Sequence, residues 1–191
     1  TGAIVAFDFV RLVPPSLSGL PSSPGGGAAW RVVDVAGGGV VGFVGDRALG
    51  GRRGLRAELD LYVPLPLDPP QALGVGVGTG AGTSFFAGSP VTSGFVSGLW
   101  LVFENAPGAD GRPDHPGTWE LLVASNDNGD ADPTTLVAAA DDAVLGVAPG
   151  AWTSVSIELR PAAVGPGELV VRVGGSILYA GPRPDGVPPQ G

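Results

Sequence analysis

Apolar and polar residues alternate along much of this chain, and the clearest example is the segment 54–63. Its apolar side chains fall at every second position, and its polar and charged side chains fall between them: Leu55, Ala57, Leu59, Leu61 and Val63 against Arg56, Glu58, Asp60 and Tyr62. Successive side chains of a strand point to opposite faces. This period of two therefore predicts a β-strand with one buried and one exposed face.

Short segments of the same kind recur along the chain between turns rich in Gly and Pro. We predict strands over residues 3–12, 29–36, 40–44, 54–63, 73–78, 83–87, 94–104, 118–125, 134–140, 150–160, 168–173 and 176–180. The segment 94–104 is apolar at nearly every position, which predicts a strand covered on both faces. For 134–140 a single helical turn around the alanines is the alternative. No amphipathic pattern is long enough for a three-turn helix, so we predict an all-β fold, an antiparallel β-sandwich or jelly roll.

The length and composition fit one folded domain. The chain has 191 residues, and its 34 Gly and 20 Pro lie mainly between the predicted strands, where they act as turn residues. We predict a single β-sandwich domain over residues 1–181, followed by a linker-like tail over residues 182–191.

Charge and cysteine usage exclude several classes of function. The net charge is −8 at pH 7, which argues against nucleic acid and against anionic lipid as partners. No apolar run approaches the length that spans a bilayer, so we expect no membrane insertion. The chain has no Cys and a single His, His115, so a zinc site is not expected.

Three segments in the second half resemble the concanavalin A-like jelly-roll domains, the architecture of laminin G domains and legume lectins. Residues 117–123 read Gly-Thr-Trp-Glu-Leu-Leu-Val, which is similar to the Gly-x-Trp-x-Leu strand of galactocerebrosidase-type lectin-like domains, and residues 136–139 match the short strand that follows it. Residues 150–157 and 169–175 resemble the family's paired strands, with Gly174-Gly175 where the family ends in Asp-Gly. The resemblance implies a jelly roll, a scaffold that serves lectins, glycanases, adhesion modules and virion parts.

The polar face of the segment 54–63 is the first candidate site. Arg56, Glu58, Asp60 and Tyr62 form a stripe in which an aromatic ring stands beside hydrogen-bonding groups, as in sites that bind sugars. Trp100 and Trp152 are either further aromatic platforms or, the interpretation we favour, core residues. The competing interpretation of the stripe is a solvated sheet face with cross-strand ion pairs.

The same stripe contains a pair of carboxylates, Glu58 and Asp60, that invites comparison with glycanases. The jelly-roll laminarinases and licheninases carry Glu-x-Asp-x-x-Glu as their catalytic residues, and the position of the last acid is occupied here by Val63. A glycoside hydrolase needs two suitably placed carboxyl groups. Because the pattern is incomplete, we predict that the chain is not an enzyme, and we rank a glycanase that uses Glu58 and Asp60 last.

An acidic loop is a candidate metal site. Asn126, Asp127, Asp130 and Asp132, with Asn128 among them, supply oxygen ligands of the kind that calcium prefers. The resemblance to laminin G domains, which often bind calcium at a rim loop, favours this interpretation. A solvated turn in an acidic protein explains the same residues equally well. No other cofactor is expected.

These observations lead to two hypotheses of different class. The first is a non-catalytic jelly-roll module, extracellular or displayed on a surface, that recognises carbohydrate or a protein surface ligand, with affinity raised by multiple copies. The second is a structural module of a filament, virion or appendage, assembled as a homo-oligomer or as part of a larger particle. Both place the protein outside the cell, on the cell surface, or on a virion or appendage.

Overall fold

The computed structural model describes residues 10–13, 21–26, 29–32, 54–63, 72–78, 98–104, 117–124, 135–162, 165 and 167–185. Contacts divide the chain into two units, residues 1–47 and 48–191. In the first unit, β1 (Val10–Val13) and β2 (Ala29–Val32) form an antiparallel pair. The prediction of one domain over residues 1–181 stays a prediction.

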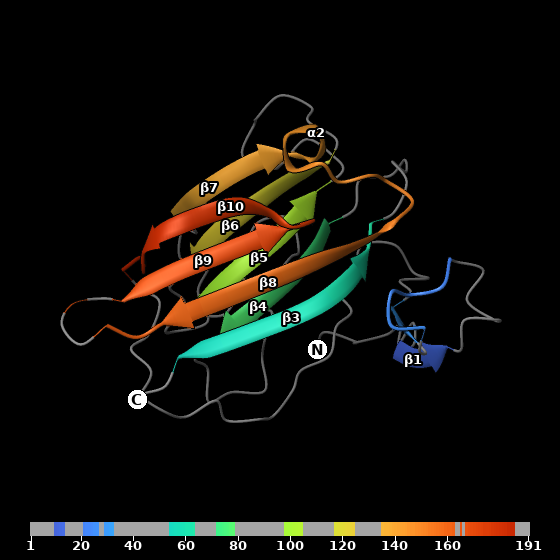
Figure 1. Ribbon diagram of the computed structural model, residues 1–191, viewed down its shortest axis with the longest axis horizontal. Coiled ribbons are helices and arrows are strands. Elements are labelled where there is room, and N and C mark those ends of the chain that lie inside the picture. The colour runs from blue at the N-terminus through green and yellow to red at the C-terminus, as the bar shows by residue number, and fades with distance from the viewer. Residues whose placement is uncertain are drawn as a thin grey trace, which may run out of the picture. The chain divides into compact units, whose positions relative to one another are not determined.

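The second unit contains two antiparallel sheets of four strands each (Figure 1). The β8 sheet has the order β10-β9-β8-β3 and consists of β3 (Leu55–Tyr62), β8 (Trp152–Arg160), β9 (Glu168–Val173) and β10 (Ser176–Pro182). The β5 sheet follows chain order and consists of β4 (Ala72–Gly78), β5 (Gly98–Glu104), β6 (Thr118–Ala124) and β7 (Thr135–Asp141). In the described residues the only helix is the single turn α2 (Asp142–Leu145). The predicted all-β, antiparallel class is confirmed.

An apolar core lies between the two sheets. Its largest fully buried side chains come from β5 and β6 on one side and from β8 and β9 on the other: Leu99, Leu101, Phe103, Trp119, Leu121, Ile157, Leu169, Val171 and Val173. Burying each such side chain contributes about 1.5–3 kcal/mol. The rings of Phe103 and Trp119 pack with their centroids 5.0 Å apart. The alternation predicted for the segment 54–63 appears in β3, whose residues are alternately exposed and half-buried against this core.

Strand β5 is buried on both faces, as its continuous apolar pattern predicted. Leu99, Leu101 and Phe103 face the shared core, while Trp100 and Val102 form a second buried cluster with Leu122. Trp100 is only 4 % exposed, so the interpretation of this residue as a core tryptophan is confirmed.

Two further predictions concern the ends of elements. The predicted strand 134–140 is observed as β7, and the helical turn α2 follows it rather than replacing it. At the C-terminal side, Pro182 pairs with Glu168, and the Arg183 N–H donates a hydrogen bond of 3.0 Å to the Gly167 carbonyl. Sheet pairing thus extends into the first residues of the predicted tail. The predicted strands 40–44 and 83–87 lie outside the described residues.

A buried carboxylate ties α2 to β6. Asp142 is 9 % exposed, and its Oδ1 accepts a hydrogen bond of 2.7 Å from the Trp119 indole Nε1–H. The Asp142 backbone N–H donates to the Gly117 carbonyl at 2.7 Å. Gly117 has a φ of +81°, and a Cβ at this position would overlap with Asp142 Oδ2. The Gly-x-Trp pattern at residues 117–119 therefore has a structural cause, since glycine allows the carboxylate to approach while tryptophan donates to it.

The pKa of Asp142 is shifted by this environment. Burial raises the pKa of the carboxyl, because removal from water disfavours the charged form, and the hydrogen bond from Trp119 opposes that effect. The negative charge of Asp141 raises the pKa further. The net direction is upward, so folding favours the protonated carboxyl relative to the unfolded chain.

The contact between Gly117 and Asp142 predicts an unequal cost for two glycine substitutions. Gly146 has a φ of +70°, and no atom lies close to the place where an added Cβ would stand. Gly146→Ala should therefore cost only the strain of the left-handed backbone, about 1 kcal/mol. Gly117→Ala should destabilise by about 2 kcal/mol more, because the overlap also breaks the buried hydrogen bond to Asp142. Urea unfolding measures both values. Equal losses in the two variants would contradict this account.

The raised pKa of Asp142 predicts a pH dependence of stability. A carboxyl whose pKa is higher in the folded chain stabilises the fold below its unfolded pKa, and this contribution is lost as the pH rises through the folded pKa. Asp142→Asn keeps an acceptor for Trp119 but cannot titrate. As the pH falls from about 7 to about 4, the unsubstituted chain should therefore gain stability relative to Asp142→Asn. The measurement is the urea midpoint at each pH, with Asp185→Asn, which removes an exposed carboxyl, as control. If the stability difference between the unsubstituted chain and Asp142→Asn does not change across this range, the effect is ruled out.

Candidate functional site

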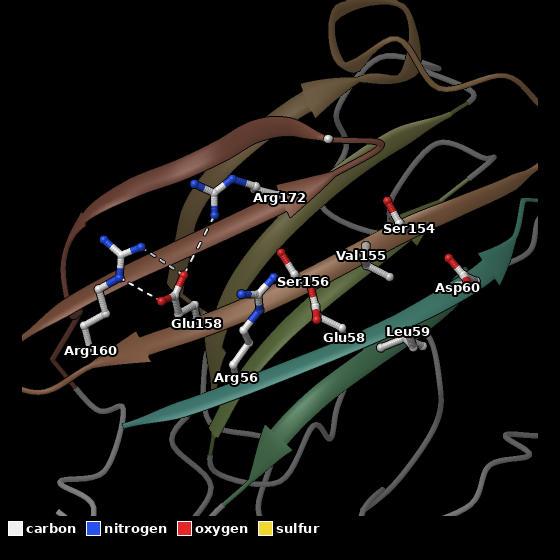
Figure 2. Close-up of a pocket in the computed structure, with 11 residues that line it drawn as sticks. Arg56, Glu58, Leu59, Asp60, Ser154, Val155, Ser156, Glu158, Arg160 and Arg172 are labelled. Carbon is white, nitrogen blue, oxygen red and sulfur yellow. Dashed lines mark hydrogen bonds and ion pairs between the residues drawn. The ribbon is translucent and has the colours of Figure 1, made fainter. Parts of the chain in front are cut away.

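The outer face of the β8 sheet carries an open groove of about 620 Å³. It lies where β3 and β8 pair in register, with Arg56 opposite Glu158, Glu58 opposite Ser156, Asp60 opposite Ser154 and Tyr62 opposite Trp152. The intervening residues of both strands face the core, so the polar residues all project to the same outer side. We call this depression the outer groove (Figure 2).

The structure brings the predicted ligand stripe together at this groove. Arg56, Glu58 and Asp60 line it, and Tyr62 lies next to Asp60 on the same face of β3. Trp152, which we expected in the core, is instead half-buried, because the inner face of β8 is taken by Thr153 and Val155. Its ring meets that of Tyr62 edge to face, with centroids 5.6 Å apart and an interplanar angle of 70°.

One end of the groove is a network of ion pairs. Arg160 holds Glu158 with two hydrogen bonds, 2.9 Å from Nε and 3.0 Å from a terminal nitrogen. Arg172 approaches the same carboxylate at 4.0 Å, as Figure 2 shows, and Arg160 also reaches Glu168 at 3.7 Å. Cross-strand ion pairs are thus present on this face, but they join β8 and β9 rather than the residues of the stripe. Arg56, however, bonds to Glu58 of its own strand and not to an acid across the sheet.

These contacts set the protonation of the cluster. The hydrogen bonds from Arg160 hold the pKa of Glu158 below its ordinary value, and the positive charges of Arg56 and Arg172 act in the same direction. The hydrogen bond to Glu58 raises the pKa of Arg56, and the hydrogen bonds to Glu158 raise the pKa of Arg160. Arg56, Glu158 and Arg160 are therefore charged at neutral pH, and each is engaged in an ion pair.

The opposite end of the groove is different. Asp60 and Ser154 lie there, away from the arginines (Figure 2). In the described part of the chain, no ion pair or hydrogen bond is made by the side chains of Asp60, Ser154 or Ser156. Carboxylate and hydroxyl oxygens accept hydrogen bonds, and the hydroxyls also donate. This end therefore offers uncommitted polar groups beside the Tyr62–Trp152 pair.

Sequence reasoning missed the half of the groove that β8 and β9 contribute. Ser154, Ser156, Glu158 and Arg172 all fall on the outer side of strands that the alternation predicts. The signal was present in that alternation. The pattern does not predict that β3 pairs with β8, because packing, and not local periodicity, determines pairing between strands so far apart in the chain.

The residues expected in a glycanase are arranged differently here. Glu58 is bound to Arg56, and Val63, at the position of the third acid, is fully buried in the core. The Val63 backbone is fixed as well, with its N–H donating to the Ala151 carbonyl at 3.0 Å and its carbonyl accepting from Gly150 at 2.8 Å.

The predicted calcium ligands Asn126, Asp127, Asp130 and Asp132 lie outside the described residues, as does His115. Calcium binding at this loop stays a prediction. Within the residues that the structure does describe, no three acidic or histidine side chains gather in a way that would hold a metal ion.

Comparisons of the chain with known protein families, with curated proteins and with solved structures found no match. Across the described residues, no helix has the length and apolar character needed to cross a membrane.

The charge network predicts a graded response of one carboxyl group. Arg160→Gln removes two hydrogen bonds from Glu158, so the pKa of Glu158 should move upward toward its ordinary value. Arg172→Gln removes only the contact at 4.0 Å, and its effect should be smaller in the same direction. Carboxyl NMR titration of the three proteins measures this order. If the pKa of Glu158 moves further in Arg172→Gln than in Arg160→Gln, Arg160 is not the main partner of Glu158 in solution.

Proposed function

We propose that this chain is a non-catalytic carbohydrate-binding module that acts outside the cell or on a surface. We assign it to the β-sandwich class with a concanavalin A-like jelly-roll topology. The two facing antiparallel sheets support the sandwich, and the segments 117–123 and 150–157 support the family. The observation that carries the function is the outer groove, with uncommitted polar side chains beside an aromatic pair.

The chemistry of the groove suits a polyhydroxylated ligand. Sugar hydroxyls donate to carboxylates and exchange hydrogen bonds with serine hydroxyls, and Asp60, Ser154 and Ser156 offer such groups. The half-buried rings of Tyr62 and Trp152 supply apolar surface for sugar C–H groups. Because these side chains stand on paired strands, the site is preformed and little ordering is needed on binding.

The absence of catalysis is supported by the state of Glu58. A retaining or inverting glycosidase needs two carboxyl groups, one of which donates a proton to the leaving oxygen. Glu58 is hydrogen-bonded to the Arg56 guanidinium of its own strand, so this carboxylate is already occupied by a partner within the protein. An open, shallow groove of this kind fits weak binding that gains strength when several copies act together.

Tyr62→Ala tests the proposed function. The substitution removes one ring of the aromatic pair next to Asp60, so affinity for the glycan identified by array screening should fall at least about tenfold, or about 1.4 kcal/mol. The matched control is Val144→Ser, which replaces an apolar residue that is already 74 % exposed on α2, outside the groove lining. Titration calorimetry of both variants gives the comparison. Array screening that finds no glycan bound above background, with a correctly folded protein, would refute the proposal.

A further inference from the structure

Four side chains form a corner at the end of the outer groove that is remote from the arginines. Asp60 and Tyr62 are two residues apart on the outer face of β3, and Ser154 and Trp152 lie directly opposite them on β8. Neighbouring strands are about 4.8 Å apart and residues i and i+2 about 6.6 Å apart, so the four side chains surround one small patch of surface. We call it the acid–aromatic corner.

The negative charge of this corner is not balanced. The other carboxylates of the groove, Glu58 and Glu158, are each hydrogen-bonded to an arginine. Asp60 has no cationic partner among the residues that the structure describes. The chain as a whole carries a net charge of −8, so the surrounding field also favours a cation and opposes an anion.

The aromatic pair formed by Tyr62 and Trp152 also favours a cation. The faces of tryptophan and tyrosine rings attract cations through their quadrupole, with tryptophan the strongest. Tyr62 and Trp152 are half-buried, meet edge to face and lie on the same outer face of the sheet as Asp60. A carboxylate beside aromatic rings is a combination that recognises an ammonium group, because the Coulomb and cation–π attractions act on the same charge.

We infer that the outer groove selects saccharides that carry a free amino group, and that the protonated amine binds at the acid–aromatic corner. This inference rests on the proposed carbohydrate-binding function and adds the chemical class of the sugar. The protonated amine donates hydrogen bonds to the Asp60 carboxylate. The remaining hydroxyls of the ligand extend along Ser154 and Ser156 toward Arg172, whose guanidinium is the least engaged of the three.

The experiment compares glucosamine oligomers of one length in two forms, with free amines and fully N-acetylated. Titration calorimetry with the full chain is done at about pH 5.5, where amines are protonated and carboxylates remain ionised. The free-amine form should bind about tenfold more tightly. Asp60→Asn should abolish that preference. Glu168→Gln, which removes an equal charge from the same face of the β8 sheet outside the groove lining, should retain it.

Each other outcome overturns a stated part of the inference. Equal binding of the two forms would overturn the amine preference and leave the proposed carbohydrate function intact. If Asp60→Asn still prefers the free-amine form, the acid–aromatic corner is not the cause of that preference. If neither form nor any other glycan binds, the proposed function fails and the inference with it. If lysine-rich peptides bind in place of sugars, with the same dependence on Asp60, the ligand of this site is a protein and the saccharide preference is wrong.

Discussion

The register between β3 and β8 is the constraint on which the rest of the molecule depends. A slip of one residue in this pairing would move every side chain of one strand to the opposite face, turning Asp60 toward the core and Leu59 away from it. The apolar core between the sheets prevents such a slip, since it would bury charges without partners. The same hydrocarbon contacts that stabilise the fold therefore also position the polar groups of the site.

The outer groove contains charged side chains that are paired with one another and one carboxylate, Asp60, that has no cationic partner among the described residues. Arg56, Arg160 and their carboxylate partners neutralise each other at close range. Exposed pairs of this kind add little stability, about 0–1 kcal/mol each. They nevertheless leave a surface in which the uncompensated charge is confined to a small region near Asp60. In the function that we propose, the selectivity of the groove comes from the few groups that have no partner among the described residues.

Periodicity was sufficient to predict the strands and the exposed stripe of β3, because a two-residue repeat reports directly which side chains are buried. It predicted the doubly covered β5 for the same reason. The position of Trp152 was beyond this reasoning, since a lone tryptophan at the entry of a strand is compatible with either face. Neither the buried link from Asp142 to Trp119 nor the contribution of Arg172 to the groove follows from local sequence, because both join strands or turns that are separate in the chain.

The chain order of the two sheets has a consequence for when the outer groove forms. Strand β3 is made before every strand of the β5 sheet, and β8 is made after all of them. The two walls of the groove therefore meet only once a long intervening stretch of polypeptide has been closed into a loop, a step that is slow in proteins dominated by non-local pairing. During synthesis and refolding alike, the outer groove is therefore completed late, and its formation reports that both sheets are in place.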